Sequence, residues 1–514
     1  METTVMPPAA PPRDDRAGRR EWIGLWVLTL ACLVYAMDLT VLDLAVPKIS
    51  AALRPSSSEL LWIIDIYGFV LAGLLLTMGT LGDHIGRRRL LLLGAAVFGT
   101  VSIVSAFSPN AECLIACRAL LGIAGATIAP STLSLIFTMF RDPRQRALAV
   151  GTWVSAFSAG GIAGPLLGGI LLERFWWGSV FFLAVPVMAL LLILGPRVLP
   201  EFRDPEAGRL DLTGAALSVI TMISLVLAMK KIAQDGIGPL PVAAALVGLV
   251  TGALFVRRQL TRPDPLLDLR LFAVGRFRTA LGINVIAVFV LFGYLLFVAQ
   301  YFQLVLGLTP LQTGLAMVPT SLASVLGAQA APYLVRVLRP AYLIAAGMAL
   351  AASGLLLLTR LSTDDGPALA VLASFIISLG LAPIFGITTE LIVGSVPPEQ
   401  SGAASGLSET ASELGGALGI SILGTIGLAI YRTDLATTLP HHLPATDAAR
   451  NTLGEAVQVS ETLPTDLASA VLSTSRTAFV HGIHVTAWIA ALGAIAIGVL
   501  AVAKLRHVPA AARS

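Results

Sequence analysis

Long apolar runs recur along the chain and are separated by short polar segments. Each approaches the roughly 20 residues that cross the hydrocarbon core of a bilayer as a helix. Lipid cannot satisfy open backbone groups, so each run is expected to be helical. The pattern predicts an all-α membrane protein with fourteen transmembrane helices, at residues 22–46, 60–81, 90–107, 112–138, 148–171, 180–196, 212–229, 240–256, 279–298, 311–334, 341–358, 368–393, 402–430 and 479–503.

The composition supports a polytopic membrane protein. Of 514 residues, 56% are hydrophobic and only 12% are charged, whereas soluble chains carry about 25% charged residues. We find no phosphate-binding loop, no nucleophile–histidine–acid set and no metal-ligand cluster in the sequence, so we expect neither an enzyme nor a cofactor nor a metal site. The three cysteines stand in apolar surroundings and are interpreted as packing residues.

The basic residues predict the orientation. With the N-terminus placed inside, the inner segments carry 24 Lys and Arg and the outer segments carry 9, while Arg118 lies within a span. This bias predicts that both termini are cytoplasmic, in the cell (inner) membrane. The positive net charge then reflects arginines at the inner leaflet, and no nucleic-acid partner is implied.

The spacing of the spans predicts two six-helix bundles with two inserted helices between them. The expected divisions are a disordered cytoplasmic tail (1–20), a first bundle (21–200), the insert (201–260), a second bundle (261–507) and a C-terminal tail (508–514). The outer segment 431–476 is longer than the other outer loops. We expect it to be partly structured and to lie over the outer mouth, where it gates release; a passive surface loop is the alternative.

A basic loop between the second and third spans carries a specific pattern. Gly79 and Gly86 permit a tight turn and close helix approach, and Arg87 begins the basic run that follows. Asp83 is placed to cap a helix start or to pair with an arginine across the interface between the two halves. A loop that only sets topology is the alternative. The spacing G-x-x-x-D-x-x-G-R-R-R is typical of the loop between spans 2 and 3 in the major facilitator superfamily, which this chain resembles.

Further motifs strengthen the resemblance. The fifth span holds G-x-x-x-G-P-x-x-G-G, formed by Gly160, Gly164, Pro165, Gly168 and Gly169, where small residues allow close helix packing. It resembles the antiporter signature of drug exporters. Sequences around residues 37–47, 61–67, 304–310 and 408–415 resemble the fourteen-span drug:proton antiporters that export quaternary-ammonium compounds and methyl viologen. The resemblance covers about residues 20–503.

Carboxylates inside the spans are candidates for proton coupling and cation binding, because a buried acid is costly in lipid. Asp38, Asp65 and Glu409 match acidic positions of the antiporters, and Glu413 follows Glu409 by one helical turn. The resemblance also places Arg118 near the proton path, with a snorkelling arginine as the alternative. Asp43, which stands where the family often has asparagine, and Glu390 are additional candidates. The tenth span has no carboxylate, so divalent substrates are not specifically expected.

Aromatic side chains near these acids could line a cation-binding cavity; packing or an interfacial position is the alternative for each. They are Trp62, Tyr67, Trp153, Phe157, Phe292, Tyr294 and Phe297. His481 and His484 are spaced as a ligand pair, but we find no further ligands in the sequence, so we do not expect a metal site.

The sequence therefore predicts a monomeric pump in the lipid bilayer that exchanges entering protons for lipophilic, mainly cationic small molecules. It would work by rocking of the two halves about a central cavity. A dedicated exporter of one endogenous metabolite or antibiotic remains an alternative. A non-transporting receptor or scaffold is a third hypothesis, but such a protein would not need to retain costly acids within its spans.

Overall fold

A computed structural model describes residues 16–203, 211–236, 238–262, 265–397, 400–438 and 449–509. Within these residues, fourteen helices are long and apolar enough to cross a membrane, so the expected all-α fold with fourteen spans is confirmed. The side chains of Asp43 and Pro165 lie outside the described part of the chain, as do the first 15 residues of the expected N-terminal tail.

The N-terminal bundle contains six membrane-length helices around one apolar core. Polar residues set the helix starts: the Ser56 hydroxyl accepts from the Glu59 backbone N–H, and the Asn110 side chain accepts from Cys113. Gly86 separates two helices with a φ of 110°, a conformation that favours glycine. The helices are α1 (Arg19–Leu53), α2 (Ser57–Ile85), α3 (Arg87–Ala106), α4 (Ala111–Met139), α5 (Pro143–Arg174) and α6 (Ala184–Val198), with the 3₁₀ segment η1 (Trp177–Leu183) before α6.

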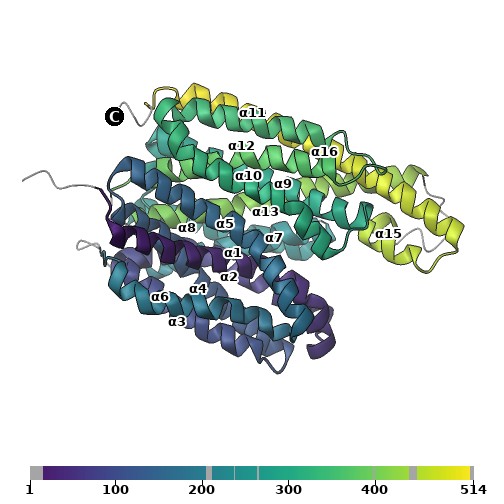
Figure 1. Cartoon of the computed structure of the whole chain (residues 1–514), viewed down its shortest axis with the longest axis horizontal. Coiled ribbons are helices and arrows are strands. Elements are labelled where there is room, and N and C mark those ends of the chain that lie inside the picture. The colour runs from purple at the N-terminus through teal and green to yellow at the C-terminus, as the bar shows by residue number, and fades with distance from the viewer. Residues whose placement is uncertain are drawn as a thin grey trace, which may run out of the picture.

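The C-terminal bundle repeats this plan around a second core. The halves are stacked in Figure 1, with α3 and α6 at one edge and α11 at the other. Its helices are α9 (Gly275–Gln300), continued by η3 (Tyr301–Val305), then α10 (Pro310–Val337), α11 (Pro340–Leu358), α12 (Ala368–Val393), α13 (Ser401–Thr438), α15 (Leu453–Ser460) and α16 (Thr465–Leu505). The short η2 (Leu269–Ala273) precedes α9.

Two inserted helices, α7 (Leu212–Asp235) and α8 (Pro239–Thr261), form a hairpin between the bundles in sequence. The Asp211 carboxylate, which caps α7, accepts hydrogen bonds from Arg258 Nε and Nη2 at 2.9 and 2.8 Å and pairs with Arg262. The hairpin packs on α2 through Ile223, whose side chain would lie 3.1 Å from a Cβ added at Gly73. α7 also contacts α13 of the other bundle.

The outer segment 431–476 is more helical than expected. α13 runs to Thr438, α15 spans Leu453–Ser460 and α16 begins at Thr465, while residues 439–448 lie outside the described part. Tyr431 donates to the Ala449 carbonyl at 2.7 Å, and Arg476 donates to Leu304 O at 3.1 Å. These contacts join the segment to the C-terminal bundle, and Figure 1 shows α15 projecting beyond that bundle. The described part extends the C-terminal bundle, and the expected position of the segment over the outer mouth stays a prediction.

The described ends of the chain lie at the same end of the molecule (Figure 1). We call this end the termini side and the other end the opposite side. An even number of spans requires both ends of the chain to lie on one side. Each contact between the two bundles can therefore be assigned to the termini side or to the opposite side.

Candidate functional site: contacts between the bundles and buried carboxylates

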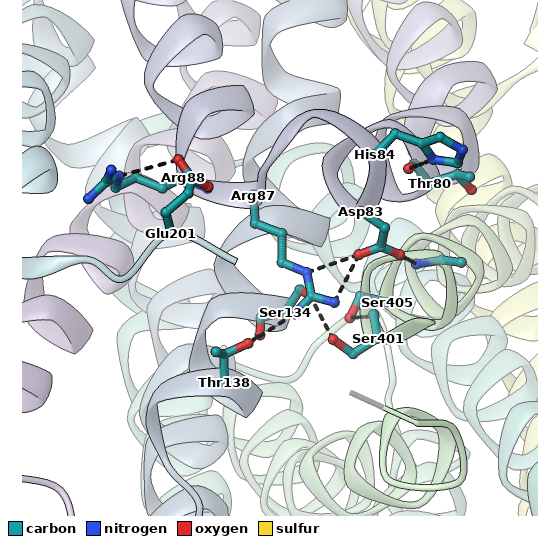
Figure 2. Close-up of polar contacts among 11 residues, drawn as sticks. Thr80, Asp83, His84, Arg87, Arg88, Ser134, Thr138, Glu201, Ser401 and Ser405 are labelled. Atoms are coloured by element: carbon teal, nitrogen blue, oxygen red, sulfur yellow. Dashed lines mark hydrogen bonds and ion pairs between the residues drawn. The ribbon is translucent and has the colours of Figure 1, made fainter. Parts of the chain in front are cut away.

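The basic loop between α2 and α3 joins the two bundles on the termini side (Figure 2). Asp83 Oδ2 accepts from the backbone N–H of Ala403 at 3.0 Å, at the first turn of α13. Its other oxygen accepts from Arg87 Nε at 2.9 Å, and Arg87 Nη1 donates to Thr138 at 2.9 Å. Asp83 thus caps a helix of the opposite bundle, while its arginine partner belongs to its own bundle. The negative charge suits the positive end of the α13 dipole.

Glycines make this junction tight. A Cβ added at Gly79 would meet the Gly402 carbonyl, and one added at Gly406 would lie 2.7 Å from Leu75 O. The hydroxyls of Ser134 and Ser401 lie 2.8 Å apart across the same junction. Helices α2 and α13 are therefore in backbone contact on the termini side, which only residues without a side chain allow.

A second junction joins α5 to α10 and α12. A Cβ at Gly151 would lie 2.8 Å from Ala328 O, and Gln329 donates to Thr152 at 3.3 Å. Arg146 lies 3.7 Å from the carboxylate of Glu390 on α12. Glu390, expected as an additional acid, therefore pairs across the bundles near the termini side.

Both junctions open toward the opposite side. Gly169 follows Gly151 by about five helical turns and so shares its face, yet a Cβ there would meet nothing within 4 Å. Gly68 precedes Gly79 by about three turns on α2 and is equally open within 4 Å. These open positions indicate that the bundles touch on the termini side and separate beyond it, and we call the space between the same helix faces on the opposite side the gap.

Three of the expected carboxylates lie on faces that line this gap. Glu409 and Glu413 follow Gly402 by about two and three turns on α13, and Asp65 precedes Gly79 by about four turns on α2. Glu409 interacts electrostatically with Glu413, and both act on the Tyr35 hydroxyl. The sequence did not single out Tyr35, although it lies in the first span one turn before Asp38.

Asp38 and Arg118 form an ion pair inside the N-terminal bundle. Arg118 Nη1 lies 2.6 Å from Asp38 Oδ2, and the two residues are 2% and 7% exposed. Arg118 also donates to Ile63 O at 3.3 Å and lies over the Tyr67 ring at 4.5 Å from its centroid. The arginine is thus paired, and it does not snorkel. Asp38 lies behind the gap-lining face, inside the bundle.

Tyr67 packs against this pair and is also influenced by an acid of α13. Its hydroxyl is buried without a hydrogen-bond partner among the described residues, and it interacts electrostatically with Asp38, Arg118 and Glu413. The hydroxyl fits against Gly125, where a Cβ would lie 2.9 Å away. This aromatic side chain therefore contacts the Asp38–Arg118 pair through the arginine and interacts electrostatically with Glu413 of α13.

The glycine motif of α5 packs against α1. Cβ atoms added at Gly160, Gly164 and Gly168 would overlap Leu33, Thr40 and Val41, respectively. Gly161 and Gly169 instead face open space. The motif therefore fixes the position of the helix that carries Asp38, a role that its spacing alone did not reveal.

The expected aromatics divide into three groups. Phe157 is partly exposed and stacks edge-on with Tyr35 and Trp153, while Trp62 and Phe292 are 41% and 44% exposed. Trp153 is buried and donates to Thr132 at 3.0 Å. Tyr294 and Phe297 are buried in the C-terminal core, where Tyr294 lies 2.9 Å from Ser378. Packing explains Trp153, Tyr294 and Phe297, and Tyr67 is fully buried against Arg118, so the candidates for an exposed cavity lining narrow to Trp62, Phe157 and Phe292.

Neutral residues bridge the corresponding helices of the second bundle. Tyr294 and Ser378 join α9 to α12, as Asp38 and Arg118 join α1 to α4. A second neutral network links Asn284 to Ser412 at 2.8 Å and to Thr388 at 3.1 Å. The sequence could have identified Asn284, because it is a polar residue within an apolar span. The buried ion pair between Asp38 and Arg118 thus lies in the N-terminal bundle, and the matching helices of the C-terminal bundle are joined by a neutral hydrogen bond.

The fold and this arrangement define a multi-pass membrane transporter. The family model described as "Major Facilitator Superfamily" matches residues 28–420, and the chain belongs to that superfamily. It is therefore a transporter and not an enzyme.

Relatives place it among multidrug efflux proteins. The chain is 44% identical to the multidrug efflux pump LfrA of Mycolicibacterium smegmatis, over 94% of this chain and 95% of LfrA. It is 37% identical to the methyl viologen resistance protein SmvA of Salmonella typhimurium, over 90% and 93% of the two chains. The crystal structure of the human organic anion transporter MFSD10 matches with a TM-score of 0.58 at 14% identity, over 94% of this chain and all of that one, which supports the fold alone.

Proposed function

We propose that the protein is a proton-driven antiporter that exports lipophilic, mainly cationic compounds such as quaternary ammonium ions, dyes and antiseptics. The observation that carries the proposal is the group of carboxylates on the gap-lining faces of α2 and α13, linked through Tyr67 to the Asp38–Arg118 pair. The efflux relatives and the antiporter glycine motif support it.

In this proposal, the proton and the cation compete for the same carboxylates. Glu409 and Glu413 lie one turn apart and repel each other when both are ionised, so a proton or a cationic substrate relieves the repulsion. Each ligand then weakens the other by the same factor, which is what exchange requires. Phe157, which stacks edge-on with the buried Tyr35, adds aromatic surface for a lipophilic cation.

Asp38 has a separate role in this scheme. Its partner Arg118 is held by the Ile63 carbonyl and the Tyr67 ring, so protonation of Asp38 would free a fixed positive charge facing Tyr67. We infer that this charge influences Glu413, because Arg118 and Glu413 both interact electrostatically with the Tyr67 hydroxyl. Proton binding in the N-terminal bundle would in this way weaken cation binding at α13.

The orientation completes the scheme. Both termini face the cytoplasm in this proposal, in agreement with the excess of basic residues on that side, so the bundles are closed toward the cytoplasm and diverge toward the outside. A monomer in the cell (inner) membrane contains all the named groups. Loading from the cytoplasm requires the opposite arrangement, which the rocking motion supplies.

Transport by purified protein in liposomes tests the proposal. With an imposed pH gradient, the wild type should move tetraphenylphosphonium against its concentration gradient, while Glu409→Gln and Asp38→Asn should lose this uphill transport. Glu173→Gln, at an exposed carboxylate at the end of α5, is the matched control and should transport normally. Uphill transport by both site variants at the wild-type rate would refute the assignment. Equal transport of tetraphenylphosphonium and neutral tetraphenylmethane would refute selection by charge.

A further inference from the structure

The two seams between the bundles differ in what covers them from the lipid side. One seam lies between α2 and α13, and the other lies between α5 and α10; both close on the termini side through the glycine contacts described above. The inserted hairpin lies along the first seam. This difference bears on how a lipophilic substrate reaches the central gap.

α7 bridges the α2–α13 seam. Ile223 fills the space beside Gly73, and Val226 packs in one apolar cluster with Phe69 and Ala72 of α2. α7 contacts α13 on its other side. The connection that follows α8 is also held on the termini side, because Thr80 of α2 donates to the Leu266 carbonyl at 3.2 Å.

The α5–α10 seam has no comparable cover within the described residues. α12 contacts both of its helices, but most of α12 is buried, which places it inside the protein rather than at the lipid face. α10 forms part of the outer surface of the protein: Leu315, Leu322 and Leu326, which lie on the side of the helix turned away from Ala328, are 55%, 54% and 51% exposed. Away from the Gly151–Ala328 contact, a Cβ added at Gly169 of α5 or at Gly314 of α10 would meet nothing within 4 Å, so the two helices make no close contact at these positions.

We propose that lipophilic substrates pass between the bilayer and the central gap through the α5–α10 seam, and that the inserted hairpin closes the α2–α13 seam to them. The proposal rests on the proposed export of lipophilic cations and adds their route. Its physical reason is partition: each added methylene raises the concentration of an amphiphile in the membrane by about fourfold, so a lateral opening receives a far more concentrated substrate than an aqueous one.

A pair of substrates with one head group and two chain lengths isolates the route. Hexyltrimethylammonium stays largely in water, whereas dodecyltrimethylammonium partitions into the bilayer. Val318 and Val325 of α10 lie on one stripe with Pro332, at intervals of about two turns, and Pro332 lies 3.4 Å from a Cβ at Gly151. Tryptophan at either valine would therefore obstruct the seam edge.

The expected result in liposomes is at least a fivefold lower initial rate for the dodecyl compound in Val318→Trp and Val325→Trp, with the hexyl rate within twofold of wild type. The matched control Leu246→Trp, at a 58% exposed position of α8, should change neither rate by more than twofold. Binding of the dodecyl compound in detergent, where no bilayer exists, should stay normal and shows that each variant is folded. If tryptophan is not tolerated, Val318→Phe replaces it.

Three results would overturn the route. They are an unchanged dodecyl rate in the folded seam variants, an equal loss for both chain lengths, or an equal loss in Leu246→Trp. A wild-type protein that concentrates neither compound under a pH gradient would instead refute the proposed function. The two failures are therefore distinct.

Discussion

At the residue scale, the Asp38–Arg118 pair is the most constrained polar contact in the described spans. Both side chains are almost fully buried, and the arginine also contacts a backbone carbonyl and an aromatic ring. Removing two charges from water costs several kcal/mol per ion, which only close pairing offsets. The pair is thus tolerated only while both members are charged, which makes it sensitive to a single proton.

A double-mutant cycle tests this dependence. Arg118→Met leaves Asp38 buried without its partner, and we expect a loss of about 3–5 kcal/mol in stability. Asp38→Asn combined with Arg118→Met removes both charges and should recover most of that loss. Thermal unfolding of the purified protein in detergent measures both. A double variant no more stable than Arg118→Met would show that packing of the arginine stem, rather than its charge, sets the cost.

At the element scale, the glycines of α5 explain how α1 is held. Gly160, Gly164 and Gly168 face α1, while Gly161 faces open space. Gly160→Ala should therefore force α1 and α5 apart and cost about 1–3 kcal/mol. Gly161→Ala is the matched control and should be neutral or slightly stabilising. Thermal unfolding compares the two; equal melting temperatures would contradict the close approach of α1 and α5.

The inserted hairpin offers a prediction with a defined pH dependence. Burial would raise the pKa of the Asp211 carboxyl, but hydrogen bonds from Arg258 and the Gly214 backbone hold that pKa below its usual range. The ionised form therefore stabilises the fold at neutral pH, and this contribution is lost only as the pH falls through the lowered pKa. Asp211→Asn should lose about 1.5–3 kcal/mol.

The measurement compares melting temperatures of wild type and Asp211→Asn across pH. The difference should stay constant from pH 7 to 5 and shrink only below the ordinary aspartate pKa of about 3.9. A difference that already shrinks between pH 7 and 5 would contradict a lowered pKa. Glu112→Gln, at an exposed position of α4, serves as the control and should leave the melting curve unchanged.

The sequence predicted the elements better than their contacts. Apolar runs located all fourteen spans, because the bilayer fixes both their length and their helical form. It could not predict that α13 and α16 extend past the expected membrane limits, because polar residues beyond the bilayer follow no hydropathy rule. The sequence identified the acids because a carboxylate within an apolar span is energetically costly in lipid. Their partners, Arg146 for Glu390 and Tyr67 for the Asp38 pair, depend on tertiary contacts between distant helices.

At the scale of the whole molecule, the two bundles are held together by unlike contacts on the two seams. Asp83 caps α13 at the α2–α13 seam, whereas Arg146 and Glu390 form an ion pair at the α5 side. The Asp83 carboxylate is stabilised by the dipole of α13 and by the positive charge of Arg87. The Arg146–Glu390 pair is longer and partly exposed, so it contributes less. Both contacts break if the termini side opens, and both therefore favour the conformation described here.

These two contacts should act independently because they lie on opposite seams. Asp83→Ala should raise the population open on the termini side by about tenfold, as expected for a charged contact of about 1.4 kcal/mol. Glu390→Gln should raise it by no more than about threefold, and the double variant by about the product of the two factors. Spin labels at Arg144 and Val337, exposed at the termini-side ends of α5 and α10, report the opening as a longer distance. Glu201→Gln, which alters contacts within the N-terminal bundle only, should leave the distance distribution unchanged. A double variant that opens no further than Asp83→Ala would mean that the α2–α13 junction alone holds the two bundles together.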